Sequence, residues 1–206
     1  MLTQFDPHTD TFRQVEEPDP SLEYTYADYL KWCFEERVEL IRGKLMKMRA
    51  PNRKHQEISG ELLVQFKQYL RNKVCKVYSA PFDVRIPRPG KRGNQEIVTV
   101  VQPDLCVICD PDKLDEKGCI GAPDLVVEIL SPGNSRKEVR IKFELYEEVG
   151  VKEYWIINSE EQNIAVFVLQ EDGRYGGARL FTSGDQIAAT AVPGFLLKIN
   201  ELFPIV

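Results

Sequence analysis

The feature that most constrains the fold is a short apolar run, Leu125–Leu130 (LVVEIL), that one carboxylate, Glu128, interrupts. The run follows the turn signal PD at residues 123–124 and ends at the breaker SPG at residues 131–133. This pattern predicts a central strand that is buried on both faces. An isolated carboxylate in such a strand is costly to desolvate unless a cation or a hydrogen-bond donor offsets the cost. Glu128 is therefore a candidate site residue.

A second acid occupies a comparable position. Asp104 follows Pro103 inside the apolar stretch of residues 97–109, where the proline reshapes the local strand pairing. If the two strands are neighbours, Asp104 and Glu128 converge on one divalent cation, and hard oxygen ligands suit Mg²⁺ or Mn²⁺. The alternative interpretation is that both acids pair with a lysine or arginine, or lie on a solvated face of the sheet.

The periodicity of apolar residues gives the order of the remaining elements. It predicts helices over residues 26–36, 54–73 and 135–149, a hairpin of residues 38–41 and 44–48, and strands within 75–86, 97–109, 125–130, 153–157, 163–169 and 173–181, with short β pieces after them. Ser135 and Glu138 have the spacing of a capping box, and Gly150 can close that helix. The order indicates a mixed α/β or α+β fold with one main sheet flanked by helices and additional C-terminal strands.

The domain organisation follows from composition. Residues 1–22 contain three prolines and several acids among few apolar residues, so we expect an irregular N-terminal arm there. Residues 23–206 are then one domain. No apolar stretch approaches the length of about eighteen residues that a membrane span needs, and the pattern of a signal peptide is missing. We expect a cytoplasmic protein with no membrane partner and no organic cofactor.

The charge balance restricts binding to nucleic acids. With 27 basic and 32 acidic residues, the formal net charge of −5 excludes a global basic field. Any nucleic-acid contact must therefore be local. The best candidate is the turn-rich segment with four cations and no acids in eight residues, namely Arg85, Arg88, Lys91 and Arg92. Its alternative interpretation is an ordinary solvated loop.

The five cysteines do not suggest a structural framework. Their number is odd and the chain is long enough to fold without staples, so we expect all of them to be reduced. Cys106 and Cys109 have a C-x-x-C spacing, but on a strand this spacing places the two sulfurs on opposite faces. Structural zinc is therefore not predicted, and the cysteines are interpreted as small buried hydrophobes.

Several segments together resemble one family. They are VQPDLCV at residues 101–107, GAPDLVVEILSP at 121–132, the helix segment from Lys142 to Tyr146, and GVKEYW at 150–155. Residues 26–30, VELIRG at residues 38–43 and His55 fit the same pattern. This combination resembles the Uma2 family, also called DUF820, from residue 25 to residue 170. The resemblance implies a restriction endonuclease-like PD-(D/E)XK core and a metal-dependent endonuclease that acts on DNA.

The resemblance also assigns roles to individual residues. Asp104 corresponds to the P-D element and Glu128 to the D/E position, which makes both of them implied metal ligands. The lysine that should follow two residues later is replaced by Leu130, so Lys142 on the next helix is the implied substitute that assists the attacking water. Without the resemblance, Lys142 is equally a surface lysine paired with Glu138.

Two further residues belong to the predicted site. Glu39 interrupts the apolar hairpin strand and matches a family glutamate that completes the carboxylate shell. His55, at the start of the predicted helix, is placed to hydrogen-bond a ligand carboxylate or a substrate phosphate, or else to make an ordinary structural hydrogen bond. Asp124 is interpreted as a turn or edge residue and Glu153 as structural.

The sequence therefore predicts an endodeoxyribonuclease that uses Mg²⁺ or Mn²⁺. In-line attack of a metal-oriented water would hydrolyse a DNA phosphodiester bond. We also expect a homodimer, because cutting both strands of a duplex commonly uses two sites related by twofold symmetry. The alternative is a catalytically weak or inactive member that uses the nuclease fold as a nucleic-acid-binding or interaction module.

Overall fold

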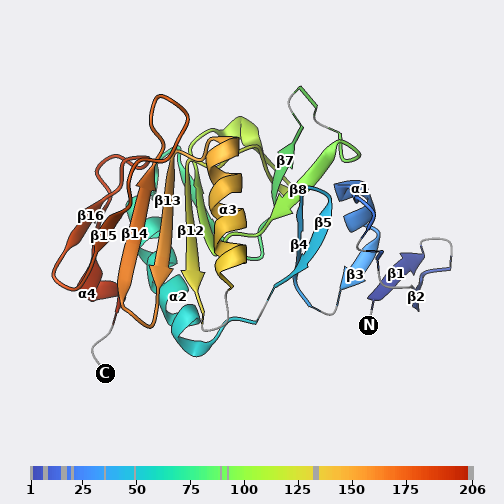
Figure 1. The fold of residues 1–206 in the computed structure, drawn as a ribbon, viewed down its shortest axis with the longest axis horizontal. Helices are drawn as coiled ribbons and strands as arrows, with labels where there is room; N and C mark the ends of the chain where they lie inside the picture. Colours follow the sequence, from blue (N-terminus) through green and yellow to red (C-terminus); the bar gives the residue numbers. More distant parts are fainter. Residues whose placement is uncertain are drawn as a thin grey trace. The chain divides into compact units, whose positions relative to one another are not determined.

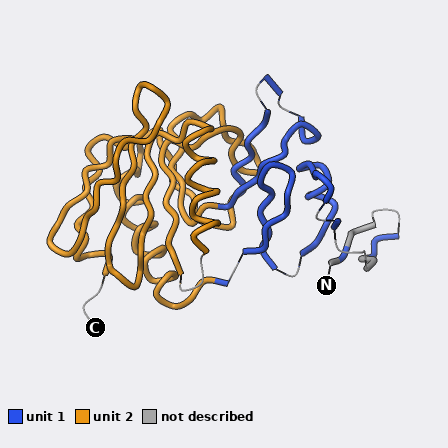
Figure 2. Tube along the Cα trace, viewed as in Figure 1, with its two compact units in different colours: residues 1–50, 83–102 blue, residues 51–82, 103–206 orange. Residues whose placement is uncertain are grey.

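The chain folds into two compact units (Figure 2). The structure is a computed structural model that describes residues 2–6, 9–14, 18–19, 21–34, 36–48, 50–88, 90–91, 93–131 and 135–203. Unit 1 consists of residues 1–50 and 83–102, and unit 2 consists of residues 51–82 and 103–206. The chain therefore enters each unit twice, and the boundary between the units does not coincide with the predicted boundary after residue 22.

Unit 1 is built from short strands and one turn of helix. Its elements are β1 (Leu2–Asp6), β2 (Thr11–Gln14), α1 (Tyr26–Tyr29), β3 (Trp32–Phe34), β4 (Val38–Ile41), β5 (Lys44–Lys47), β7 (Val84–Pro87) and β8 (Ile97–Val101). The strands pair in the orders β2-β1-β3 and β7-β8-β4-β5. A small apolar cluster of Tyr26, Leu40, Ile97 and Val100 forms the core of this unit. The predicted hairpin over residues 38–48 is confirmed.

Two sequence predictions in unit 1 are wrong. The arm predicted to be irregular contains the antiparallel hairpin of β1 and β2. The helix predicted over residues 26–36 ends at Tyr29, because Trp32–Phe34 instead forms β3 and pairs with β1. The second error has a physical cause: β3 pairs with β1, a segment about thirty residues away, so no local periodicity reveals the strand.

Unit 2 holds the main sheet, which has the strand order β15-β14-β13-β12-β9-β6 (Figure 1). The strands are β6 (Lys76–Ser79), β9 (Leu105–Ile108), β12 (Leu125–Leu130), β13 (Glu153–Asn158), β14 (Asn163–Val168) and β15 (Arg179–Phe181). The smaller elements are η1 (Pro111–Lys113), β10 (Leu114–Asp115), β11 (Gly118–Ile120), β16 (Gln186–Ala188), β17 (Leu196–Lys198) and α4 (Ile199–Leu202). β12 lies inside the sheet, parallel to β13 and antiparallel to β9.

Two helices cover opposite faces of this sheet (Figure 1). Helix α2 (Arg53–Tyr69) packs with alternate residues of β12, Leu125, Val127 and Ile129, in the main apolar core. Glu128 points to the other face, where helix α3 (Arg136–Val149) lies. The predicted mixed α/β or α+β architecture with additional C-terminal strands is confirmed. The prediction of one main sheet is wrong, because the described strands form a second six-stranded sheet that includes β7, β8, β4 and β5.

Capping residues fix where these helices begin and end. The Asn52 side chain accepts a hydrogen bond from the backbone N of His55 at the start of α2. Ser135 and Glu138 form the predicted capping box of α3, and Gly150 ends it with a φ of 81°, a conformation that favours glycine. His55 is thereby held in the first turn of α2.

The cysteines correct another expectation. Cys75 and Cys109 are joined by a disulfide, so the prediction that all five cysteines are reduced is wrong for this pair. Cys75 immediately precedes β6 and Cys109 follows β9, and the register of these strands pairs Lys76 with Ile108. Cys106 and Cys119 are buried and unoxidised. In the part of the chain that the structure describes, no helix is both long and apolar enough to span a bilayer.

Candidate active site

Adjacent strands of unit 2 bring Asp104 and Glu128 together. In the antiparallel pair of β9 and β12, Leu105 lies opposite Val127. Extending this register by one residue places Asp104 opposite Glu128, at the end of the pairing. Both residues are 8% exposed. The prediction that the strands carrying these two acids are neighbours is therefore confirmed.

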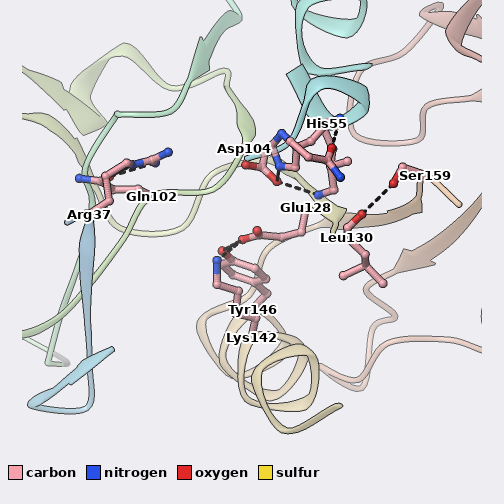
Figure 3. A network of polar contacts seen from close by, with 11 residues as sticks. Arg37, His55, Gln102, Asp104, Glu128, Leu130, Lys142, Tyr146 and Ser159 are labelled. Atoms are coloured by element: carbon pink, nitrogen blue, oxygen red, sulfur yellow. Dashed lines mark hydrogen bonds and ion pairs between the residues drawn. The ribbon is translucent and has the colours of Figure 1, made fainter. Parts of the chain in front are cut away.

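Asp104 is held by the first turn of α2 and by the backbone of β12. Its Oδ2 accepts a hydrogen bond of 2.7 Å from the backbone N of Ile129 and lies 3.0 Å from Nε2 of His55 (Figure 3). His55 is itself 8% exposed, and its buried Nδ1 has no hydrogen-bond partner among the described residues. A neutral imidazole that donates through Nε2 leaves Nδ1 as an acceptor. His55 thus provides Asp104 with a hydrogen-bond partner through Nε2, while its own buried Nδ1 has no partner among the described residues. The missing hydrogen bond on Nδ1 costs stability.

Glu128 is held by two side chains of α3. Its Oε1 accepts hydrogen bonds from Nζ of Lys142 at 2.8 Å and from Oη of Tyr146 at 2.6 Å (Figure 3). Lys142 and Tyr146 are four residues apart, so they lie on the same face of the helix. Lys142 therefore contacts the predicted ligand carboxylate.

This donor set is compatible with a divalent cation. The site contains the carboxylates of Asp104 and Glu128 and the ammonium of Lys142, which contacts Glu128, so these groups carry an excess of negative charge when His55 is neutral. Within the described residues there is no group of three or more His, Cys, Asp or Glu side chains arranged for a metal ion. Mg²⁺ is commonly bound through one or two carboxylates and retains several waters. Asp104 and Glu128 fit that mode of binding and not a site built from protein ligands alone.

Glu39 lies in unit 1, where it has a structural partner. It is 3% exposed, and its Oε1 accepts a hydrogen bond of 2.8 Å from the backbone N of Gln102. The Gln102 side chain accepts from Arg37 (Figure 3) and donates to Asp83. Glu39 is thus part of a buried polar network, and its role in a carboxylate shell stays a prediction.

The predicted basic patch is not a single exposed surface. Arg85 lies in β7, is 2% exposed and has its guanidinium 5.6 Å from the centre of the Tyr26 ring, so its inclusion in an exposed loop is wrong. Arg88 and Lys91 are exposed, each with an acid at 3.9 Å, Glu23 and Glu96 respectively. Arg92 lies outside the described residues.

Two other buried acids of unit 2 have structural partners on both oxygens. Asp124 contacts Nζ of Lys152 through Oδ1 at 2.6 Å and accepts from the backbone N of Cys109 through Oδ2. Glu153 accepts from Nε1 of Trp155 and from the backbone N of Ala191. Burial raises the pKa of the Glu153 carboxyl, and these donors counteract the rise. The structural interpretation of Glu153 agrees with these contacts.

The residue that the sequence reasoning missed is Tyr146. It lies in the helix predicted over residues 135–149 and is only 1% exposed, as an apolar core residue would be. Its hydroxyl, however, donates to Oε1 of Glu128 at 2.6 Å. The available signal was its spacing of four residues from Lys142 on a helix that follows the strand of Glu128.

Comparisons with known proteins place this geometry in context. The model of the Uma2 family, described as "Putative restriction endonuclease", matches residues 26–200. An uncharacterized protein of Synechocystis sp. is 28% identical over 149 residues, which cover 71% of this chain and 74% of the relative. The crystal structure of a "putative nuclease belonging to DUF820" from Anabaena variabilis matches with a TM-score of 0.68 and 23% identity, over 87% of this chain and 97% of the other. The chain therefore has the predicted restriction endonuclease-like fold.

Proposed function

The chain belongs to the Uma2 family, and from this membership we propose that it is a metal-dependent endonuclease that hydrolyses phosphodiester bonds in DNA. Family and fold indicate a nuclease. The observation that carries the finer proposal is the arrangement of Asp104 and Glu128. They lie opposite each other on adjacent strands, and each accepts hydrogen bonds from neighbouring groups of unit 2.

Asp104 and Glu128 would hold the cation, Mg²⁺ or Mn²⁺. When bound, such a cation activates a water and stabilises the negative charge that develops on a phosphodiester. The protein's part is to keep two carboxylates oriented in a buried place. The backbone N of Ile129 and the α3 donors supply this orientation.

Lys142 supplies the positive charge that the missing lysine at position 130 would have supplied. Its Nζ already lies 2.8 Å from Glu128, and its side chain is 15% exposed. A long flexible stem allows the ammonium to move from the carboxylate to a phosphate oxygen or to the attacking water. This is the role proposed for it.

His55 acts through Asp104 as a positioning residue. Its Nε2 contact and the backbone N of Ile129 fix the same oxygen of Asp104. A buried nitrogen without a hydrogen-bond partner costs about 1–3 kcal/mol, so a histidine at this position lowers the stability of the fold. The cost is understandable if the imidazole orients a functional carboxylate.

The decisive experiment is cleavage of supercoiled plasmid and of single-stranded DNA with Mg²⁺ or Mn²⁺. Asp104→Ala and Glu128→Ala are compared with the wild type and with Glu57→Ala, which removes an exposed acid of α2 that pairs with Arg53. We expect metal-dependent cutting by the wild type and by Glu57→Ala, and loss of cutting in both site variants. Cutting that survives both substitutions would refute the assignment of the site. If neither the wild type nor any variant cuts DNA, the result favours the nucleic-acid-binding module instead.

A further inference from the structure

We propose that the two donors to Glu128 have different functions: Tyr146 is a fixed donor that orients the carboxylate, and Lys142 is an exchangeable donor that leaves it when a divalent cation binds. This inference rests on the proposed function, because it concerns the same site. It begins from the observation that both donors use one oxygen, Oε1 of Glu128. An oxygen that accepts from two donors keeps one hydrogen bond when the other donor leaves.

The surroundings of the two donors differ. Tyr146 is 1% exposed, and its ring packs edge-to-face against Tyr154 with 5.0 Å between the ring centres. Its hydroxyl can move only through rotation of a packed ring. Lys142 has a side chain that is 15% exposed and a four-carbon stem that adopts many rotamers. Tyr146 is therefore the rigid donor and Lys142 the mobile one.

The charges of the two donors differ as well. A cation that binds Asp104 and Glu128 repels the ammonium of Lys142, because like charges in a partly buried place are poorly screened. The phenol of Tyr146 is neutral, and its hydrogen bond to the carboxylate remains compatible with a cation on the same group. Cation binding thus weakens the Lys142 contact selectively and leaves the Tyr146 contact in place.

This difference explains how a lysine on a helix can serve a site whose strand carries Leu130. Before the cation binds, Lys142 offsets the charge of buried Glu128. Afterwards its ammonium is released for the phosphate or the attacking water, while Tyr146 keeps Glu128 in its orientation. Loss of the Tyr146 hydroxyl should therefore affect cation affinity, and loss of the Lys142 charge should affect it in the opposite direction.

The test measures Mn²⁺ binding to the full chain by electron paramagnetic resonance of the free ion, without DNA. Tyr146→Phe removes only the hydroxyl, and we expect its dissociation constant for Mn²⁺ to rise about tenfold. Lys142→Met removes the charge at similar length, and we expect binding to tighten by about threefold or more while plasmid cleavage is lost. Thermal unfolding of each variant establishes that it is folded.

The matched control is Tyr175→Phe. Tyr175 belongs to the same aromatic cluster of unit 2, and its hydroxyl donates to the backbone O of Val151 at 3.0 Å. This variant also loses one tyrosine hydrogen bond, but away from Glu128, so we expect Mn²⁺ binding and cleavage to match the wild type. An equal loss of Mn²⁺ affinity in Tyr146→Phe and Tyr175→Phe would reduce Tyr146 to a structural residue.

The outcomes separate this inference from the proposed function. If the wild type neither binds Mn²⁺ nor cuts DNA, the proposed function fails, and this inference fails with it. If the wild type does both and Tyr146→Phe binds Mn²⁺ equally well, only the orienting role of Tyr146 is overturned. If Lys142→Met binds Mn²⁺ more weakly than the wild type, Lys142 is a fixed donor and its proposed release is wrong.

Discussion

The two ends of β12 each present a pair of buried carboxylates, and the pairs are held differently. Asp124 and Glu153, at the start of β12 and on β13, receive donors on both oxygens of each carboxylate. Asp104 and Glu128, which meet near the other end, are held through Oδ2 and Oε1 respectively. We call the first two the structural pair and the second two the site pair.

The comparison teaches that burial does not identify a functional acid. All four carboxylates are 8% exposed or less, and each is contacted by a cationic or hydrogen-bonding group. The elements that supply the donors distinguish the pairs. The structural pair accepts hydrogen bonds from the backbone N of Cys109 and of Ala191, which ties loops to the local fold. The site pair is contacted by helix side chains, His55 of α2 and Lys142 and Tyr146 of α3, as in a site whose carboxylates are oriented by surrounding side chains.

The strongest way to break this comparison is to neutralise the site pair. Glu128→Gln keeps the shape of the side chain, but it removes the charge that a cation requires. We expect plasmid cleavage to fall about a hundredfold or more, since metal binding supplies several kcal/mol of transition-state stabilisation. A cleavage rate within a few-fold of the wild type, measured at saturating Mg²⁺, would show that Glu128 is not a ligand.

The corresponding change in the structural pair should act on stability. Glu153→Gln places an amide NH₂ against the donors Trp155 or Ala191 and leaves one of them unsatisfied. We expect unfolding to be easier by about 2 kcal/mol, which lowers the Tm by about 4–8 °C for a chain of this length. Glu171→Gln, at an exposed position, serves as the control for thermal unfolding. An unchanged Tm would show that the carboxylate of Glu153 does not contribute to the stability of the fold.

Glu153 should also give the stability a pH dependence of defined sign. Burial raises the pKa of its carboxyl in the folded chain above the ordinary value of 4.5. At a pH between 4.5 and this raised pKa, the folded chain therefore binds more protons than the unfolded chain. Its contribution to stability is therefore largest below pH 4.5 and declines as the pH rises through the raised pKa. Denaturant unfolding of the wild type and Glu153→Gln across this window should show their difference shrinking as the pH increases. A difference that grows with pH would contradict the direction.

The sequence allowed the site pair to be predicted because each acid interrupts an apolar run. The adjacency of their strands then followed from the fold. Lys142 could be predicted as a site residue only from the family resemblance, since a helical lysine four residues from Glu138 suits an exposed ion pair equally well. The contact of Tyr146 could not be predicted from its pattern alone, because a tyrosine among apolar helical residues has the same pattern whether its hydroxyl is used or not.

The remaining errors come from long-range pairing. Arg85 looked like part of a basic loop, but it lies in β7, which pairs with β8 and buries it. The disulfide joins Cys75 to Cys109 across 34 residues because β6 pairs with β9. The pairing of β1 with β3 likewise joins Leu2 to Phe34. None of these contacts has a local sequence signature.

The smallest effect is expected from Lys152, the lysine that contacts Asp124 of the structural pair. Lys152 and Lys142 make similar contacts, with Nζ–carboxylate distances of 2.6 and 2.8 Å, but their side chains are 67% and 15% exposed. Solvent screens the Lys152 pair, so Lys152→Met should cost about 0–1 kcal/mol of stability. Asp124 keeps its bond from the backbone N of Cys109. We therefore expect Lys152→Met to cleave DNA like the wild type, whereas Lys142→Met does not. Equal losses of cleavage in the two variants would show that net charge, and not the place of the lysine beside Glu128, controls the reaction.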